Sequence, residues 1–258
     1  RGVMSEPSET PFPRPLDGAP VTRLPSGLKP ARIPLEGRHV RLEPLDPADH
    51  LNDLHAASHG SEDARAIWTF LPVGPWPSKR AYEKHLAANA AAIDRVYLAI
   101  RSTATGRACG QASYMDIQPE HGVIEIGYIW FAPELQRSRA ATEALFLLLD
   151  HAMTDLRYRR MQWRCNALNA KSRAAARRLG FRFEGIFHNH MIYKGLNRDT
   201  AWYSILYDEW PEVRANLAAW LDDDNFDADG RARRSLSAMM QARTPSARGA
   251  AEPVRGAA

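Results

Sequence analysis

One segment constrains the fold more than any other: a nearly apolar strand that leads into an amphipathic helix. Residues 122–131 contain few polar side chains, as expected of a strand in the middle of a sheet. From about 139 to 156, apolar residues recur at the three- and four-residue spacing of one helix face. A buried strand that is followed by such a helix is typical of an α/β domain.

The chain around this segment alternates strands and helices. Period-two alternation and turn residues predict the strands, and helical spacing with capping residues predicts the helices. Strands are expected at 40–45, 95–101, 107–117, 122–131, 159–167, 181–193 and 201–208, and helices at 47–58, 78–93, 139–156, 170–179 and 211–221. Hairpins first and strand–helix alternation later predict an α/β fold, with a mixed central sheet of about seven strands and helices on both faces.

Composition sets the limits of the domain. Residues 1–30 are rich in Pro, Gly, Ser and Thr without periodicity, which predicts a flexible arm. We expect the folded domain at 31–222. We expect 223–258 to be a mostly disordered tail, with room for a short helix around 236–242.

The residue content excludes several classes of protein. No apolar run is long enough to cross a bilayer, and the N-terminus has no signal-peptide pattern, so no membrane partner is expected. Two cysteines, Cys109 and Cys165, cannot build a disulfide framework or a zinc cluster, which favours a reduced, cytoplasmic setting. The net charge of +4 suits a polyphosphate ligand at least as well as nucleic acid, because several arginines lie in the tail.

The turn between the apolar strand and its helix is predicted to bind an anion. The first N–H groups of a helix have no internal partner, and the helix dipole adds positive potential there. Small side chains at Ser138, Ala140 and Ala141 let a ligand approach the backbone. Arg137 and Arg139 add charge that suits a pyrophosphate.

This strand, turn and helix resemble the corresponding part of the GNAT superfamily of N-acetyltransferases. Residues 136–141 (QRSRAA) stand where GNAT enzymes carry a Q/R-x-x-G-x-G/A pyrophosphate loop, with Arg139 in place of the usual glycine. Residues 166–181 resemble the N-x-x-S-x-x-x-x-x-x-L-G-F segment of the ribosomal-protein (RimJ/RimL-like) branch, and 187–202 resemble its closing hairpin. The similarity covers residues 33–210, and the effect of Arg139 on cofactor binding stays open.

The resemblance implies direct transfer of an acetyl group from acetyl-CoA to a primary amine, without a metal. A protein or peptide N-terminal amine is the favoured acceptor. The alternatives are a small-molecule amine, such as an antibiotic or an aminoacyl conjugate, and a non-catalytic CoA-binding module. A monomer or a homodimer is expected, and nucleic acid is not an expected partner. Cofactor contacts are expected from Trp130, Phe131, Gln136, Arg137, Ser138, Arg139, Ala140, Ala141, Thr142, Asn169 and Ser172.

Two residues are candidates for proton transfer. Glu125 is a carboxylate within an apolar strand, so either it acts as a general base for the amine or it bonds a polar side chain of a neighbouring strand. Ser172 is either an acid for the departing sulfur or a helix-terminal hydroxyl that satisfies backbone groups. Relatives with a tyrosine acid place it four residues before the Gly-Phe pair, where this chain has Ala176.

The acceptor side is less defined. Four aromatic residues either line the acceptor pocket or belong to the core: Trp68, Phe70, Trp76 and Tyr82. His188 and His190, two apart on a strand, are expected on one face, either in contact with the acceptor or simply exposed. Arg173 and Arg177 form either a basic stripe near the adenosine or an ordinary solvated helix face.

Overall fold

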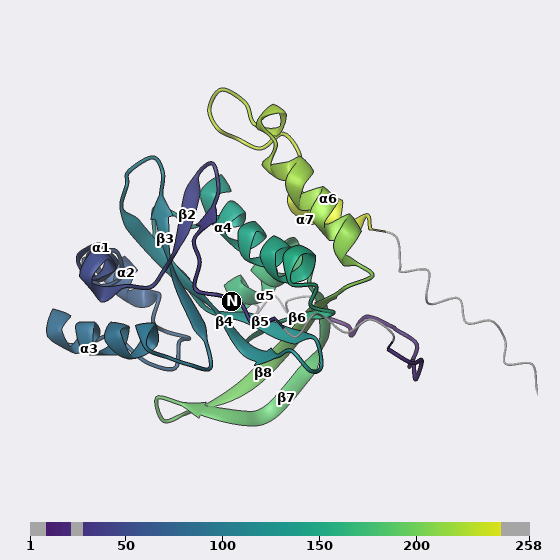
Figure 1. The fold of residues 1–258 in the computed structure, drawn as a ribbon, viewed down its shortest axis with the longest axis horizontal. Coiled ribbons are helices and arrows are strands. Elements are labelled where there is room, and N and C mark those ends of the chain that lie inside the picture. Colours follow the sequence, from purple (N-terminus) through teal and green to yellow (C-terminus); the bar gives the residue numbers. More distant parts are fainter. Residues whose placement is uncertain (1–8, 22–27, 244–258) are drawn as a thin grey trace, which may run out of the picture.

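The computed structural model describes residues 9–21 and 28–243, which form an eight-stranded sheet with helices on both faces (Figure 1). The strands are β1 (Leu35–Glu36), β2 (Val40–Pro44), β3 (Val96–Ser102), β4 (Ala108–Gln118), β5 (Val123–Phe131), β6 (Arg160–Asn166), β7 (Arg182–Tyr193) and β8 (Leu196–Leu206). The helices are α1 (Pro47–His59), α2 (Glu62–Ala66), α3 (Lys79–Ala90), α4 (Arg139–Asp150), α5 (Ala170–Arg178), α6 (Trp210–Leu221) and α7 (Leu236–Gln241), with a π-helical turn η1 (His151–Asp155) and a 3-10 turn η2 (Asp223–Asn225). The predicted mixed α/β fold is confirmed.

The strands follow the order β1-β2-β3-β4-β5-β6-β8-β7 across the sheet. Among the described residues, neighbouring strands are antiparallel except β5 and β6, which run parallel. The eighth strand is β1, a two-residue edge strand that is too short to produce a sequence pattern. The five-residue α2 escapes prediction for the same reason.

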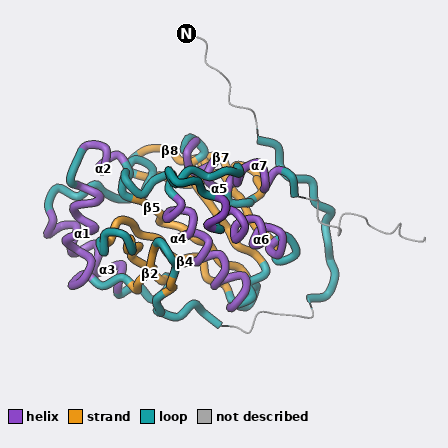
Figure 2. Tube along the Cα trace, turned by 90° about the horizontal axis from the view of Figure 1, so that it is seen from above, coloured by secondary structure: helices purple, strands orange, loops and turns teal. Residues whose placement is uncertain are grey.

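Alternate strand residues supply two hydrophobic cores, one on each face of the sheet. In β3, Leu98 and Ile100 belong to the core under α4–α7, whereas Tyr97 and Ala99 belong to the core under α1–α3. Both views show α1–α3 gathered at one end of the molecule, away from α4–α7 (Figures 1 and 2). Helix α1 packs on β4, and α3 packs on β3. The same face of β6 and β8 lies beyond these helices and carries polar side chains.

The C-terminal segment extends the folded domain beyond the predicted boundary at 222. The side chains of Leu236 and Met240 on α7 are buried in the main core. Nη2 of Arg243 donates a hydrogen bond to the carbonyl of Gly180 at 2.8 Å. The prediction of a mostly disordered tail is therefore wrong for 223–243, while residues 244–258 lie outside the described residues.

Part of the predicted flexible arm also contacts the domain. The Glu9 carboxylate is nearly buried and accepts hydrogen bonds from Arg173, Arg177 and the hydroxyl of Tyr203. The backbone N–H of Phe12 donates to the carbonyl of Phe183 at 3.1 Å. Arg173 and Arg177 are therefore neither a free basic stripe nor a plain solvated face. Residues 1–8 and 22–27 of the predicted arm lie outside the described residues.

Two further findings bear on the class of protein. Among the described residues, no helix is both long and apolar enough to cross a membrane. In the same part of the chain, no group of three or more His, Cys, Asp or Glu side chains is arranged to hold a metal ion.

Candidate active site

The most informative feature of the sheet is a split between β5 and β6. The two strands pair only at their first residues, and the last pair is Glu125 with Gln162. Beyond it, β5 pairs with β4 alone. A bulge bends β5 further: Tyr128 has a φ of 52°, and Tyr128 and Ile129 together oppose one residue of β4. The strands therefore diverge from Glu125 onward.

The split exposes a backbone donor on its β5 side. The N–H of Ala132 donates to the carbonyl of Cys109, on the β4 side, at 2.8 Å. Successive N–H groups of a strand point to opposite edges, so the N–H of Phe131 points toward β6. The backbone of Phe131, rather than that of Trp130, is the donor that faces the split.

The start of α4 lies at the end of β5. Ser138 is the N-cap residue, and its Oγ accepts a hydrogen bond from the N–H of Ala141 at 3.0 Å. The N–H groups of Arg139 and Ala140 have no partner inside the helix. Gln136 holds the turn in place, because its Nε2 donates to the carbonyl of Phe131 at 3.1 Å. The start of α4 is therefore a candidate anion site, at the place where the sequence predicts one.

The start of α5 lies at the end of β6. Oδ1 of Asn169 caps the helix by accepting the N–H of Ser172 at 3.1 Å. The hydroxyl of Ser172 accepts a hydrogen bond from Nε1 of Trp163 at 3.1 Å, and it also interacts with the thiol of Cys165. Thr142 links the start of α4 to the C-terminal end of α5, because its Oγ1 accepts a hydrogen bond from Nη1 of Arg178 at 3.0 Å.

Glu125 is buried at the point where the strands part. Only 2% of the residue is exposed. Its Oε2 lies 2.6 Å from Nε and 2.5 Å from Nη2 of Arg164, on β6. Burial raises the pKa of Glu125 above its ordinary value, although the hydrogen bonds and charge of Arg164 act against this rise. Oε1 is directed elsewhere and lies beside Gly127, where an added Cβ would approach it to 3.4 Å.

The comparisons with known proteins agree with this geometry. Residues 39–182 match the acetyltransferase (GNAT) domain family. The chain belongs to the GNAT acetyltransferase family. The predicted family, its fold and its class of enzyme are thereby confirmed.

Two solved structures and one curated protein illustrate the similarity of this acetyltransferase to others. A GCN5-related N-acetyltransferase from Brucella melitensis is 43% identical over 83% of this chain and 96% of its own, with a TM-score of 0.81. A probable GNAT-family acetyltransferase from Chromobacterium violaceum ATCC 12472 is 38% identical over 76% of this chain and 100% of its own, with a TM-score of 0.68.

The curated protein is YdaF of Bacillus subtilis (strain 168), provisionally named a ribosomal N-acetyltransferase. It is 32% identical over 105 residues, which are 41% of this acetyltransferase and 57% of YdaF. The match therefore spans little more than half the length of YdaF. It supports the predicted ribosomal-protein branch.

Arg139 plays a different part in this acetyltransferase from the predicted one. Its guanidinium turns away from the loop and forms an ion pair with Asp223 at 2.5 Å, over the ring of Phe226 at 4.1 Å. The positive φ of the loop falls at Arg137, at 61°, whereas Arg139 is the first helical residue of α4. Position 139 therefore does not require glycine, and the exposed Arg137 is the cation left to the loop.

Trp68 and Tyr82 do not line the acceptor side directly. Both have no exposed surface and pack in the core under α1–α3, where Trp68 lies 5.7 Å from Trp130. The prediction that they contact the acceptor is wrong for this conformation. Trp76, which the sequence also offers for the acceptor pocket, is a partly exposed aromatic residue of the same cluster, and so is Tyr128, which the sequence patterns did not identify.

His59 and His85 form hydrogen bonds within the aromatic cluster under α1–α3, and both are neutral. Nε2 of His85 lies 2.9 Å from the amide nitrogen of Asn89 and 2.9 Å from the hydroxyl oxygen of Tyr128. Nε2 of His59 accepts the backbone N–H of Trp76 at 3.1 Å. Burial lowers the pKa of each histidine to about 4.

His188 and His190 do not share a face as predicted. The strand is irregular between them: Asn189 has a φ of 49°, and the β7–β8 register shifts at this point. Nδ1 of His188 pairs with Asp199, and Nδ1 of His190 with Thr200. Asp199 and Thr200 are consecutive residues of β8, so their side chains lie on opposite faces. His188 is exposed, and His190 is the one beside Trp202.

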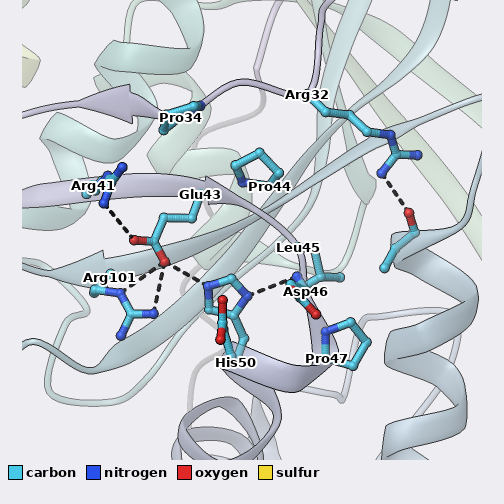
Figure 3. Close-up of a pocket in the computed structure, with 12 residues that line it drawn as sticks. Arg32, Pro34, Arg41, Glu43, Pro44, Leu45, Asp46, Pro47, His50 and Arg101 are labelled. Atoms are coloured by element: carbon cyan, nitrogen blue, oxygen red, sulfur yellow. Dashed lines mark hydrogen bonds and ion pairs between the residues drawn. The ribbon is translucent and has the colours of Figure 1, made fainter.

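A cavity of about 670 Å³ lies away from the split, between β2, β3 and α1. Its charged groups already bind one another, as Figure 3 shows: Glu43 is joined to Arg41, Arg101 and His50. Arg32 donates to the carbonyl of Ala90. This network stabilises the junction between the sheet and α1.

Proposed function

We propose that this acetyltransferase moves the acetyl group of acetyl-CoA directly to a primary amine, with the N-terminal amine of a protein or peptide as the preferred acceptor. The observation that carries the proposal is the β5–β6 split, with the starts of α4 and α5 at its end. The partial match to YdaF supports a protein acceptor.

The residues around the split suit acetyl-CoA. The N–H groups of Arg139 and Ala140 would bind the pyrophosphate, with Arg137 adding charge. Ala140 leaves room for close approach to the backbone. Asn169 and Thr142 would border the remaining arm of the cofactor. When bound, acetyl-CoA supplies an activated acyl group as a thioester.

Transfer of the acetyl group needs three contributions from the protein: a hydrogen-bond donor to the carbonyl, a base for the amine and a group that assists departure of the sulfur. The N–H of Phe131 would donate a hydrogen bond to the thioester carbonyl and stabilise the charge that develops there. Oε1 of Glu125, which Arg164 leaves free by holding Oε2, would receive a proton from the attacking amine. The hydroxyl of Ser172 would donate a hydrogen bond to the departing sulfur as the carbon–nitrogen bond forms and the carbon–sulfur bond breaks. The thiolate leaves and then takes up a proton from solvent, which restores the proton that the amine gave to Glu125.

The proposal is tested by thiol release from acetyl-CoA with a panel of peptides and small amines. We expect turnover with peptides that have a free N-terminal amine and none with N-terminally blocked peptides. Turnover of blocked peptides that contain lysine would overturn the N-terminal preference. Failure to bind acetyl-CoA would overturn the enzymatic proposal.

A further inference from the structure

Arg198 on β8 is a buried cation whose charge lowers the pKa of Glu125 but which forms no ion pair within the described residues. Only 8% of the residue is exposed, and its Nε has neither solvent contact nor a hydrogen-bond partner. Nη1 reaches only the sulfur of Met191, at 3.7 Å. The guanidinium lies over the ring of Tyr193, at 4.5 Å. Within residues 9–21 and 28–243, no carboxylate forms an ion pair with it.

Other arginines on the same side of the molecule are paired. Arg164 binds Glu125, and Arg160 binds Glu184. Burying a guanidinium without an opposite charge is costly, whereas a planar fork of N–H donors suits a carboxylate in two-point contact. An unpaired buried arginine is therefore explained best by a ligand that supplies the missing charge.

The position of Arg198 relates it to the candidate active site. Alternate residues of β8 share a face, so Arg198 and Trp202 point to the same side. Trp202 lies directly opposite Arg164, whose guanidinium is 4.8 Å from its ring. Arg198 therefore shares the face of the sheet that carries the Glu125–Arg164 pair. It also lies just beyond the C-terminal end of β6, where the split opens.

The same geometry separates Arg198 from the phosphate end of the cofactor. The anion site at the start of α4 belongs to the face that α4–α7 cover. Arg198 belongs to the opposite face, which those helices leave free. The hairpin of β7 and β8 extends along this free face toward α3 (Figure 1), and Lys194 at its tip donates to the carbonyl of Trp68 at 2.6 Å. An acceptor would enter between the hairpin and the split.

We propose that Arg198 binds a carboxylate of the acceptor, so that the preferred acceptors carry a carboxylate close to the amine. This inference rests on the proposed function and names its substrate class. The carboxylate comes either from an acidic side chain near the N-terminus of a peptide or from the α-carboxylate of an amino acid. Both offer the same chemistry to the guanidinium.

The test compares acceptors that differ only in this charge. One pair of peptides has glutamate or glutamine as the second residue, and one pair of small amines is serine and serine amide. The proteins are the full chain, Arg198→Met, Arg198→Lys and a control, Arg214→Met, which removes an exposed arginine that pairs with Asp150 on the other face. Acetyl-CoA affinity, peptide binding to the CoA-loaded protein, kcat/KM and Tm are measured for each.

We expect the full chain and Arg214→Met to prefer at least one acid over its amide by about tenfold or more in kcat/KM and in binding. Arg198→Met should reduce that preference to about one, and Arg198→Lys should retain part of it. The acetyl-CoA affinity should not change. The Tm of Arg198→Met should stay level or rise, because the variant removes an unpaired buried charge. A purely structural arginine would instead lower Tm and leave the preference intact.

The outcomes separate this inference from the proposed function. Acetyl-CoA binding and turnover without an acid preference, or a preference that Arg198→Met keeps, would overturn the role of Arg198 alone. A protein that fails to bind acetyl-CoA overturns the proposed function. Even then, acid-selective peptide binding that Arg198→Met loses would support a carboxylate-binding site at Arg198. The acid pair that shows the preference identifies the source of the carboxylate.

Discussion

The Glu125 carboxylate and the Arg164 guanidinium form a buried ion pair across the last residues that join β5 to β6, with Oε2 2.6 Å from Nε. The pair occupies the point at which the sheet opens. It fixes one carboxylate oxygen and leaves the other beside Gly127. A general base in this position would therefore be oriented by Arg164, whose hydrogen bonds and charge also lower its pKa.

This pairing gives a prediction about pH. Glu125→Gln should lower kcat by about 100-fold, with little change in acetyl-CoA affinity. Arg164 acts to lower the pKa of Glu125, so Arg164→Met should raise that pKa and move the acidic limb of the kcat–pH profile to higher pH. Arg160→Met is the matched control, because Arg160 pairs with Glu184 on the same side of the sheet and should leave the limb in place. A kcat for Glu125→Gln equal to that of the unmodified chain across pH 6–9 would remove Glu125 from the mechanism.

The neutral histidines predict a loss of stability in acid. The pKa of His59 and that of His85 fall from an ordinary 6.5 to about 4 in the folded chain. Between these values the unfolded chain binds protons that the folded chain does not, so this contribution is full above pH 6.5 and declines as the pH falls toward 4. Tm measured from pH 7 to pH 4 should decline less steeply for a His59→Gln/His85→Gln variant. Parallel curves for both proteins would contradict this assignment.

The contacts of Arg139 predict that its side chain contributes to stability and not to acetyl-CoA binding. Its guanidinium binds Asp223 and the carbonyl of Leu221, at the start of the packed C-terminal segment. Arg139→Ala should lower Tm and increase proteolysis within 223–243, with acetyl-CoA affinity changed less than about threefold. Asp223→Asn serves as the partner control and should have the same effects. A large loss of acetyl-CoA affinity in Arg139→Ala alone would contradict this assignment and show that the Arg139 side chain binds the pyrophosphate.

The hydrogen bonds of Glu143 predict that this residue stabilises the edge of the sheet. This nearly buried residue of α4 accepts backbone N–H groups from Arg38, His39 and Val40, at 3.0, 2.7 and 3.0 Å. Glu143→Ala should lower the free energy of unfolding by about 3 kcal/mol, because three donors lose a charged acceptor. Glu143→Gln keeps one acceptor oxygen and should cost less. Urea denaturation measures both, and an unchanged midpoint for Glu143→Ala would refute the role.

Local pattern and a family motif predict much of this molecule. The strand at 123–131, the capped start of α4 and the cap at Asn169 follow from residues adjacent in sequence. The pairing of Glu125 with Arg164 leaves a weaker signal: Gln162, Arg164 and Asn166 alternate with apolar residues in β6, which marks one polar face. That alternation could have identified Arg164. It could not have identified Arg198, because the neighbours of Arg198, Asn197 and Asp199, are polar as well.

Other features depend on contacts between distant segments. Glu9 lies 164 residues from Arg173, and Arg139 lies 84 residues from Asp223, so no local pattern reveals either pair. The irregular backbone at Asn189 separates His188 from His190, although their spacing alone favours a shared face. The burial of Trp68 and Tyr82 likewise follows from how α1–α3 pack on β3 and β4.

Isothermal titration with acetyl-CoA tests the central claim most directly. The unmodified chain should bind with a micromolar dissociation constant. Arg137→Ala should weaken binding about tenfold through the loss of a charge-assisted contact, whereas Arg139→Ala should not. Absence of binding at millimolar acetyl-CoA would contradict the account and leave this GNAT fold without its cosubstrate.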